Sequence, residues 1–293
     1  MERSLGVKDF KILTALEERV DEALTQREIA TAADLSVGTV NRAMADLHER
    51  GFVREGMLSA AGLEALEPYR VIAAGFGSRL VPITLNTPKP LIRVQGRRII
   101  DSLLDAVYAA GIEEVYVVRG YLAEQFDQLL YKYPGLKFIE NPFYNEANNI
   151  SSAVAAKDLL QNAYVFESDL LLYNPKLITK YQYSSNYLGV PVQVTDDWCF
   201  QTRRGVITGL SVGGTDCHHM FGISYWTEED GRKLADDVPA TFAMPGGKER
   251  YWDEVALRYF ARNYEVVVRE CTFDDVIEID TYRELQELDK AYV

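Results

Sequence analysis

The sequence predicts an α/β protein in which a domain built on a mainly parallel, mixed sheet follows a small α+β domain. From Val71 onward, short β-branched stretches alternate with amphipathic helical stretches, a pattern typical of βαβ units. Ahead of that strand, three short helical patterns lead into Phe52–Arg54, which begins a small hairpin. We therefore predict two domains, 1–68 and 69–293.

Composition limits the class of protein. The chain has 293 residues, of which 47% are hydrophobic, enough for a sizeable core. No apolar run approaches the roughly 18 residues that span a bilayer, and the N-terminus lacks the apolar segment of a signal peptide. We therefore expect a cytoplasmic protein without a membrane partner. The three cysteines show no metal-ligand spacing, and the net charge of −13 argues against a surface that coats nucleic acid.

The first 50 residues contain clear helix boundaries. Thr25 and Glu28 form a capping box ahead of the second helix. The third helix is expected from Thr39 to about Arg50, with Gly51 as its stop. Over about residues 5–67, this order of elements resembles the winged helix-turn-helix domains of bacterial regulators.

The resemblance leaves the role of this N-terminal domain open. In that family the third helix enters the major groove of DNA, which implies contacts from residues 36–42, namely Ser36, Thr39, Asn41 and Arg42. Residues 1–69, however, carry 8 Lys and Arg against 13 Asp and Glu, the wrong sign for a surface that neutralises phosphates. A packing or dimerisation role, and so a homodimer, is the alternative.

A glycine-containing loop follows the Val71 strand. Gly75 and Gly77 allow a ligand to approach the backbone N–H groups closely. Arg79 and Lys89 then add positive charge to the same anion. The expected nucleotide-binding residues of this loop are Ala73, Ala74, Gly75, Gly77, Ser78, Arg79 and Lys89.

These letters resemble the A-A-G-x-G-[ST]-R-L-x-P-x-T-x-x-x-P-K-x-L signature of nucleotidyltransferases that attach a nucleoside monophosphate to a small phosphate. The resemblance covers about residues 70–290 and implies a Rossmann-like nucleotidyltransferase fold. It also implies that Arg79 and Lys89 are catalytic, because they neutralise charge on the triphosphate and the departing pyrophosphate.

Acidic residues end two predicted strands. Asp169 lies near the end of a strand predicted over Tyr164–Leu170. A second strand is predicted over Cys271–Asp280, and Glu278 and Asp280 share one of its faces. Mg²⁺ prefers one or two carboxylates together with phosphate oxygens. The resemblance to the family's Asp-x-Asp and Glu-Ile-Asp segments implies that these three acids hold Mg²⁺, with Asp169 catalytic.

Two of these assignments have alternatives. Glu167 stands where the family pattern has its first aspartate, and a solvated turn is its alternative role. Asp280 could equally cap the helix that follows it.

A polar stretch narrows the resemblance. Tyr144, Asn148, Asn149 and Ser152 match a Tyr…Asn-Asn-x-x-Ser pattern of bacterial CTP:phosphocholine cytidylyltransferases. The match implies that Asn148 and Ser152 bind the nucleotide and that Tyr144 and Asn149 bind the acceptor. A helix N-cap and a loop amide are the alternative roles of the two asparagines.

Two aromatic residues complete the expected site. By the same resemblance, Trp198 and Tyr251 contact choline, since ring faces attract a quaternary ammonium without needing N–H donors. Core packing is their alternative. The sequence thus predicts transfer of CMP from CTP to phosphocholine. The alternatives are 2-aminoethylphosphonate as acceptor, a sugar-1-phosphate nucleotidyltransferase, and a DNA-binding regulator that uses the transferase domain as a ligand sensor.

Overall fold

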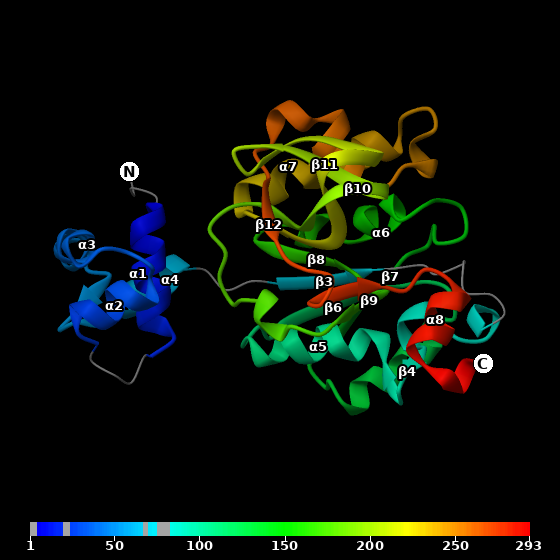
Figure 1. Cartoon of the computed structure of the whole chain (residues 1–293), viewed down its shortest axis with the longest axis horizontal. Helices are drawn as coiled ribbons and strands as arrows, with labels where there is room; N and C mark the ends of the chain where they lie inside the picture. Colours follow the sequence, from blue (N-terminus) through cyan, green and yellow to red (C-terminus); the bar gives the residue numbers. More distant parts are fainter. Residues whose placement is uncertain (1–4, 20–23, 67–69, 75–82) are drawn as a thin grey trace. The chain divides into compact units, whose positions relative to one another are not determined.

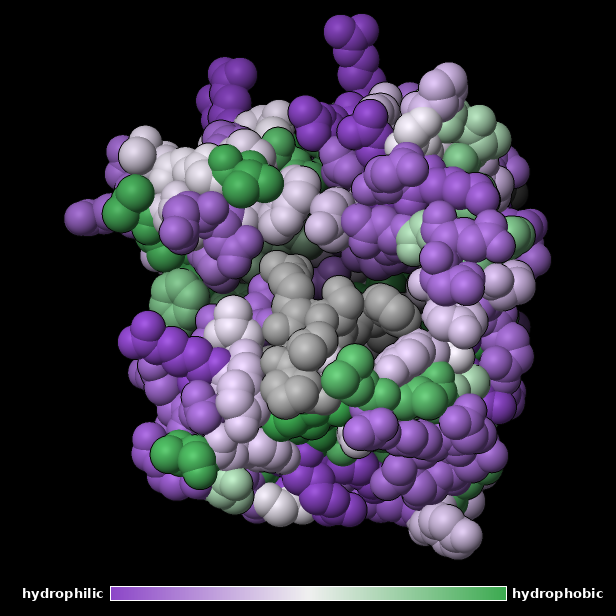
Figure 2. All heavy atoms as spheres, turned by 90° about the vertical axis from the view of Figure 1, so that its right-hand side faces the viewer, coloured by the Kyte–Doolittle hydropathy of each residue, from purple (hydrophilic) through white to green (hydrophobic). Residues whose placement is uncertain are grey.

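The computed structural model of the chain describes residues 5–19, 24–66, 70–74 (backbone) and 83–293. The chain divides into two compact units, Met1–Pro68 and Tyr69–Val293. Within the described residues, no helix is both long and apolar enough to cross a membrane. On the face shown in Figure 2, polar side chains predominate and hydrophobic ones gather in small separate groups.

Among its described residues, the N-terminal unit has three helices, a hairpin and a fourth helix. Figure 1 labels these helices α1 to α4. Its elements are α1 (Val7–Glu17), α2 (Gln26–Ala32), α3 (Val37–Glu49), β1 (Val53–Arg54), β2 (Met57–Leu58) and α4 (Ala60–Leu66). The capping box of Thr25 and Glu28 is confirmed. Helix α3 begins earlier than predicted because the hydroxyl of Ser36 accepts the Thr39 N–H at 3.2 Å and caps it.

The second unit is built on a seven-stranded sheet with the order β10-β12-β11-β8-β3-β6-β7. Strand β3 pairs in parallel with β6 and β8, and β6 pairs in parallel with β7. Strand β11 runs antiparallel to β8. The predicted mixed, mainly parallel sheet is therefore confirmed. The strands are β3 (Arg70–Ala74), β6 (Glu114–Arg119), β7 (Lys137–Glu140), β8 (Ala163–Glu167), β10 (Asn186–Arg203), β11 (Val206–Trp226) and β12 (Val267–Glu270).

Helices cover both faces of this sheet. Figure 1 shows α5 (Ile99–Ala109) on one face and α6 (Ile150–Ala155) and α7 (Glu228–Phe242) on the other. Trp226 and Trp252 lie in the core with their ring centroids 5.8 Å apart. The register places Ala74 beside Glu167, so β3 and β8 end together. In sheets of this kind ligands bind beyond the carboxyl ends of the strands.

A second, two-stranded sheet brings the C-terminal segment to the same edge. Strand β9 (Leu170–Leu172) pairs antiparallel with β13 (Val276–Glu278), which places Glu278 opposite Leu170. The N–H of Ile279 donates to the carbonyl of Asp169 at 3.3 Å. Buried apolar residues hold this layer against the β4–β5 hairpin (Arg93–Val94 and Arg97–Arg98) and α8 (Tyr282–Leu288), and they are Ile92, Val94, Ile99, Leu171, Ile279 and Leu285.

Both acid-bearing strands differ from the prediction. The strand expected over Tyr164–Leu170 is broken between β8 and β9, so Asp169 lies in a turn. The strand expected over Cys271–Asp280 is wrong for its first half, where a turn precedes β13. The carboxylate of Asp275 accepts both the N–H and the hydroxyl of Thr272 at 2.8 Å and so holds the chain in that turn.

Two predicted helices are also wrong in detail. Residues 124–131 lie in a 3₁₀ helix, Ala123–Tyr131, that starts after Leu122 at φ +50° without a side-chain cap. The helix expected over 150–160 ends at Ala155 and continues as a 3₁₀ turn, Lys157–Leu159. There the N–H of Leu159 bonds the carbonyl three residues earlier, at Ala156.

Candidate active site

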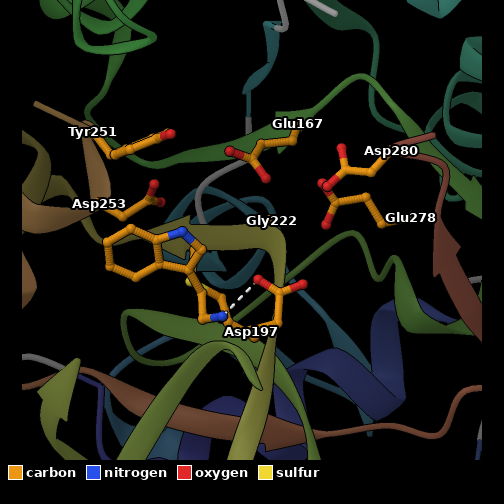
Figure 3. A pocket seen from close by; sticks show the side chains of 9 residues that line it. Glu167, Asp197, Gly222, Tyr251, Asp253, Glu278 and Asp280 are labelled. Carbon is orange, nitrogen blue, oxygen red and sulfur yellow. Dashed lines mark hydrogen bonds between the residues drawn. The ribbon is translucent and has the colours of Figure 1, made fainter. Parts of the chain in front are cut away.

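A pocket of about 120 Å³ lies beyond the carboxyl end of β8. In Figure 3, Tyr251 and Asp253 lie on one side of it, Glu278 and Asp280 on the opposite side, and Glu167 between them. Five of the nine lining residues are acids, and the full lining is Glu167, Asp197, Trp198, Met220, Gly222, Tyr251, Asp253, Glu278 and Asp280.

Three carboxylates converge where Glu167 approaches the Glu278 side of the pocket, and we call this side the metal end. Glu167, Asp169 and Glu278 each offer an oxygen, and these oxygens lie within 4.8 Å of one another. They come from the end of β8, the turn after it and the end of β13, so the pairing of β13 with β9 assembles them. The predicted set was Asp169, Glu278 and Asp280, and the structure places Glu167 in the cluster.

Lys89 links this cluster to Asp280. The Lys89 side chain is 4% exposed, and its Nζ donates to Asp169 Oδ2 at 2.8 Å and to Asp280 Oδ1 at 2.9 Å. Burial lowers the pKa of Lys89, but the attraction of Asp169 and Asp280 outweighs it, so the pKa stands above its ordinary value. Asp280 does not cap α8, because the hydroxyl of Thr281 accepts the Glu284 N–H in that role.

The donor set suits a divalent cation. Within the described residues, Asp169 Oδ1 is buried and has no hydrogen-bond partner. A buried carboxylate oxygen without a partner is costly unless a cation or a donor reaches it. The three clustered carboxylates supply the oxygen ligands that Mg²⁺ prefers. One of their oxygens, Asp169 Oδ1, has no hydrogen-bond partner among the described residues.

Burial and mutual repulsion raise the pKa values of two of these carboxylates. Burial raises the pKa of Glu278 to about 9, and repulsion from Asp169 and Asp280 adds to the rise. Burial, followed by repulsion from Asp253 and Asp169, holds the pKa of Glu167 well above its usual range. A bound cation would relieve this repulsion and stabilise the ionised carboxylates.

Glu167 owes its position to a glycine on the neighbouring strand. Ile223 of β11 pairs with Phe166 of β8, so Gly222 lies next to Glu167. A Cβ on Gly222 would lie 2.1 Å from Glu167 Oε2 and 2.5 Å from its Cγ. The sequence prediction did not single out Gly222 for this role, although a glycine inside a strand is a signal of close approach.

The two asparagines bond within the protein. Asn149 Nδ2 donates to Glu167 Oε1 at 3.3 Å, and Asn149 Oδ1 accepts the backbone N–H of Trp252 at 2.9 Å. Asn148 Nδ2 donates to the carbonyl of Glu249 at 3.3 Å. Asn149 stands at the N-cap position of α6 without a side-chain capping bond, and Asn148 bonds a loop carbonyl, so of the alternative roles only the side-chain cap is absent. Both side chains tie the start of α6 to residues 249–252.

Tyr144 and Ser152 are not among the described residues that line this pocket. The ring of Tyr144 packs on Gly120, where an added Cβ would lie 2.4 Å from Tyr144 Cβ. The hydroxyl of Ser152 accepts from Asn141 Nδ2 at 3.2 Å. Ala73 and Ala74 are in β3. Four predicted loop residues lie outside the described part of the chain, and they are Gly75, Gly77, Ser78 and Arg79.

Trp198 and Tyr251 meet at the other end of the pocket, which we call the aromatic end. Their ring centroids are 5.4 Å apart, and the rings meet edge to face at 64°. The strand register shifts between Thr195 and Trp198, and this irregularity frees Asp197 from the regular pairing. The Asp197 carboxylate accepts the Trp198 N–H at 2.6 Å.

The sequence prediction missed two acids at this end. Asp253 is 5% exposed, and its Oδ1 accepts a short hydrogen bond from the hydroxyl of Tyr187. Burial raises the pKa of Asp253 to about 6, although the Tyr187 bond opposes the rise. Asp197 and Asp253 each stand within two residues of a predicted aromatic residue, and this proximity was the available signal.

Comparison with known proteins agrees with this geometry. Residues 70–197 match the MobA-like NTP transferase domain family, and residues 7–54 match a winged helix-turn-helix DNA-binding family. The chain is 35% identical to a 2-aminoethylphosphonate cytidylyltransferase of Lancefieldella rimae over 76% of this chain and 92% of that protein. It is 28% identical to a choline-phosphate cytidylyltransferase of Streptococcus pneumoniae over 74% of this chain and 96% of that protein.

A solved structure shows the same fold. CTP:phosphocholine cytidylyltransferase from Streptococcus pneumoniae superposes with a TM-score of 0.70 at 26% identity, over 77% of this chain and 99% of that one. The resemblance to nucleotidyltransferases and the predicted fold are thereby confirmed. The chain belongs to the cytidylyltransferase family of nucleotidyltransferases and carries a winged helix-turn-helix domain at its N-terminus.

Proposed function

We propose that this enzyme transfers CMP from CTP to 2-aminoethylphosphonate, giving CMP-aminoethylphosphonate and pyrophosphate. The observation that carries the proposal is the division of the pocket. Carboxylates that can share a cation with phosphate oxygens lie at one end, and Asp197 and Asp253 lie beside two rings at the other. A small acceptor with an anionic head and an ammonium tail matches both ends.

The reaction is an in-line displacement. An oxygen of the acceptor's phosphonate forms a bond to the α-phosphorus of CTP as the bond to the pyrophosphate oxygen breaks. The phosphonate oxygen is already anionic at neutral pH, so no residue needs to act as a general base. The enzyme contributes orientation and charge neutralisation.

The described residues supply these contributions at the metal end. Asp169, Glu278 and Glu167 would hold Mg²⁺, which when bound supplies positive charge for the phosphoryl oxygens. Lys89, within hydrogen-bond distance of Asp169 and Asp280, adds a second positive charge beside that position. We propose that Arg79 and the N–H groups of Gly75 and Gly77 act on the triphosphate, as the signature implies.

The acids at the aromatic end favour a primary ammonium. A primary ammonium offers three N–H donors, and the pocket offers carboxylate acceptors in Asp197 and Asp253. The buried Asp253 would lack a donor on its pocket side if the ligand carried only methyl groups. The relative from Lancefieldella rimae, named for the same acceptor, supports this choice.

Phosphocholine, the acceptor predicted from the sequence, is the second candidate. Trp198 and Tyr251 line the pocket, and their rings can attract a trimethylammonium group through cation–π interactions. Two rings in edge contact with each other leave a large part of such a cation facing carboxylates. We therefore rank phosphocholine below 2-aminoethylphosphonate.

The test is pyrophosphate release with Mg²⁺, crossing CTP, UTP, dTTP and ATP with 2-aminoethylphosphonate, phosphocholine and glucose-1-phosphate. We expect a maximum with CTP and 2-aminoethylphosphonate. A maximum with phosphocholine would move the second candidate to first place. Turnover with glucose-1-phosphate alone, or with no pair, would reject the proposal.

For the N-terminal domain we infer packing or dimerisation rather than strong DNA binding. Asn41 and Arg42 are exposed on α3, as a groove-reading helix would require, but the surplus of acids in residues 1–69 opposes a phosphate surface. Light scattering on the full chain should show a homodimer. Salt-dependent binding of duplex DNA that Arg42→Ala abolishes would contradict the inference.

A further inference from the structure

Two restraints fix the side chain of Glu167. Gly222 lies so close that a Cβ there would stand 2.1 Å from Glu167 Oε2. Asn149 Nδ2 holds Oε1 from the other side at 3.3 Å, and Asn149 is itself anchored by the backbone N–H of Trp252. The carboxylate therefore has one orientation, set by β11, α6 and the segment before Asp253.

That orientation places the carboxylate between the two ends of the pocket. Figure 3 shows Glu167 between Asp253 on one side and Glu278 with Asp280 on the other. One oxygen of Glu167 is close enough to join Asp169 and Glu278 in the metal-end cluster. Glu167 lines the same pocket as Trp198, Tyr251 and Asp253 of the aromatic end. Glu167 thus faces the place where an acceptor would lie.

The length of the Glu167 side chain brings its carboxylate to the pocket lining. A glutamate extends the carboxylate one methylene further than an aspartate would at the same position. Gly222 leaves room for this side chain, because a Cβ there would meet Glu167 Oε2, Cδ and Cγ. Glu167 and Gly222 therefore line the pocket together.

We propose that Glu167, held by Gly222 and Asn149, is the specificity-determining residue that selects an acceptor with N–H groups on its ammonium and rejects a fully methylated one. The inference rests on the proposed function and names the chemical feature of the acceptor that the site recognises. A carboxylate accepts a charge-assisted hydrogen bond from each N–H that reaches it. A trimethylammonium offers none, so it gains no such bond from Glu167.

The test is a methylation series at constant phosphate chemistry. Phosphoethanolamine and its N-methyl, N,N-dimethyl and N,N,N-trimethyl forms, the last being phosphocholine, are compared with 2-aminoethylphosphonate by kcat/KM. For the natural chain we expect a fall along the series, with the steepest step at the loss of the last N–H. A site built to bond an N–H rejects the analogue that lacks it by a large factor.

Two variants change the carboxylate in different ways. Glu167→Asp withdraws it by one methylene, and Gly222→Ala displaces it while leaving it intact. In each variant we expect the ratio of kcat/KM for the primary over the trimethylated acceptor to fall by at least about tenfold. If Gly222→Ala fails to fold, Glu167→Asp alone decides the question.

Glu140→Asp is the matched control, because Glu140 ends β7 as Glu167 ends β8 but is exposed and paired with Arg119. It should keep the natural ratio. If Glu167→Asp lowers turnover of all acceptors equally and weakens Mn²⁺ binding measured by titration, Glu167 serves the metal alone and the inference is overturned. Absence of turnover by the natural chain with every acceptor would instead reject the proposed function.

Discussion

The two ends of the pocket use the same functional group in different surroundings. At the metal end, Glu167, Asp169 and Glu278 crowd one another, and Lys89 bonds Asp169 and Asp280. At the aromatic end, Asp253 is buried beside Tyr187 and near the rings of Trp198 and Tyr251. Crowded carboxylates call for a concentrated charge such as a divalent cation, whereas a carboxylate flanked by rings suits an organic cation.

Because the two ends differ in this way, we expect the metal end to control turnover and the aromatic end to control affinity for the acceptor. Charge neutralisation matters most as the transition state forms, so its loss lowers kcat. Recognition of a distant ammonium acts on ground state and transition state alike, so its loss raises KM.

The largest effect is expected for Asp169→Asn. This change removes one charge from the metal end and should lower kcat by at least about 1,000-fold with little change in KM for the acceptor. Circular dichroism should show an unchanged fold. The control Asp158→Asn alters an exposed ion pair with Lys157 and should retain full activity. An Asp169→Asn enzyme with a near-normal kcat would contradict the assignment of the metal end.

Lys89→Met should lower kcat by about 100-fold. It should also lower the free energy of unfolding by about 1–3 kcal/mol, because Asp169 and Asp280 lose the cation between them. Addition of Mg²⁺ should reverse part of the fall in melting temperature, because the ion replaces the positive charge of the lysine. The surface variant Lys157→Met is the control. If Mg²⁺ does not change the melting temperature of Lys89→Met, Lys89 does not act at the metal end.

Trp198→Leu tests the aromatic end. Loss of the ring should raise KM for the acceptor by about tenfold while kcat and KM for CTP stay close to their natural values. Tyr173→Leu, an exposed aromatic outside the pocket lining, serves as control. An equal rise in KM for CTP would mean that Trp198 supports the nucleotide instead.

A smaller effect concerns pH and stability. The pKa of Asp253 is raised to about 6 in the folded protein, so the folded state binds more protons than the unfolded state between about pH 4 and 6. Stability from this group therefore falls as the pH rises through that window. Asp253→Asn should reduce the fall by about 1–3 kcal/mol, measured by urea unfolding at pH 4.5 and 7. An unchanged pH dependence would show that Asp253 is not buried as described.

The metal end was easier to predict than the aromatic end. Asp169, Glu278 and Asp280 stand at the ends of predicted strands, and alternation along Ile277–Asp280 predicts a common face for Glu278 and Asp280. Glu167 was left undecided because its role depends on Gly222, which is distant in sequence and adjacent only once β11 pairs with β8.

The aromatic end depends on irregular backbone. Asp197 lines the pocket through a shift in strand register, and Asp253 does so from the short helical start directly ahead of the π-helix Val255–Tyr259. Neither feature has a periodic pattern. Asn149 was assigned to the acceptor because a sequence cannot show that Glu167 and Trp252 already use both ends of its amide.

The central claim is that the two ends of the pocket bind the two ends of one acceptor. The most direct test compares kcat/KM for 2-aminoethylphosphonate with that for ethylphosphonate, which lacks the ammonium, in the natural chain and in Asp253→Asn. Removal of the ammonium should cost the natural chain about 100-fold. The same removal should cost Asp253→Asn at most about tenfold, because one of the carboxylates that bind the ammonium is already gone. Equal losses in both proteins would show that the acceptor's ammonium lies elsewhere and would contradict the account.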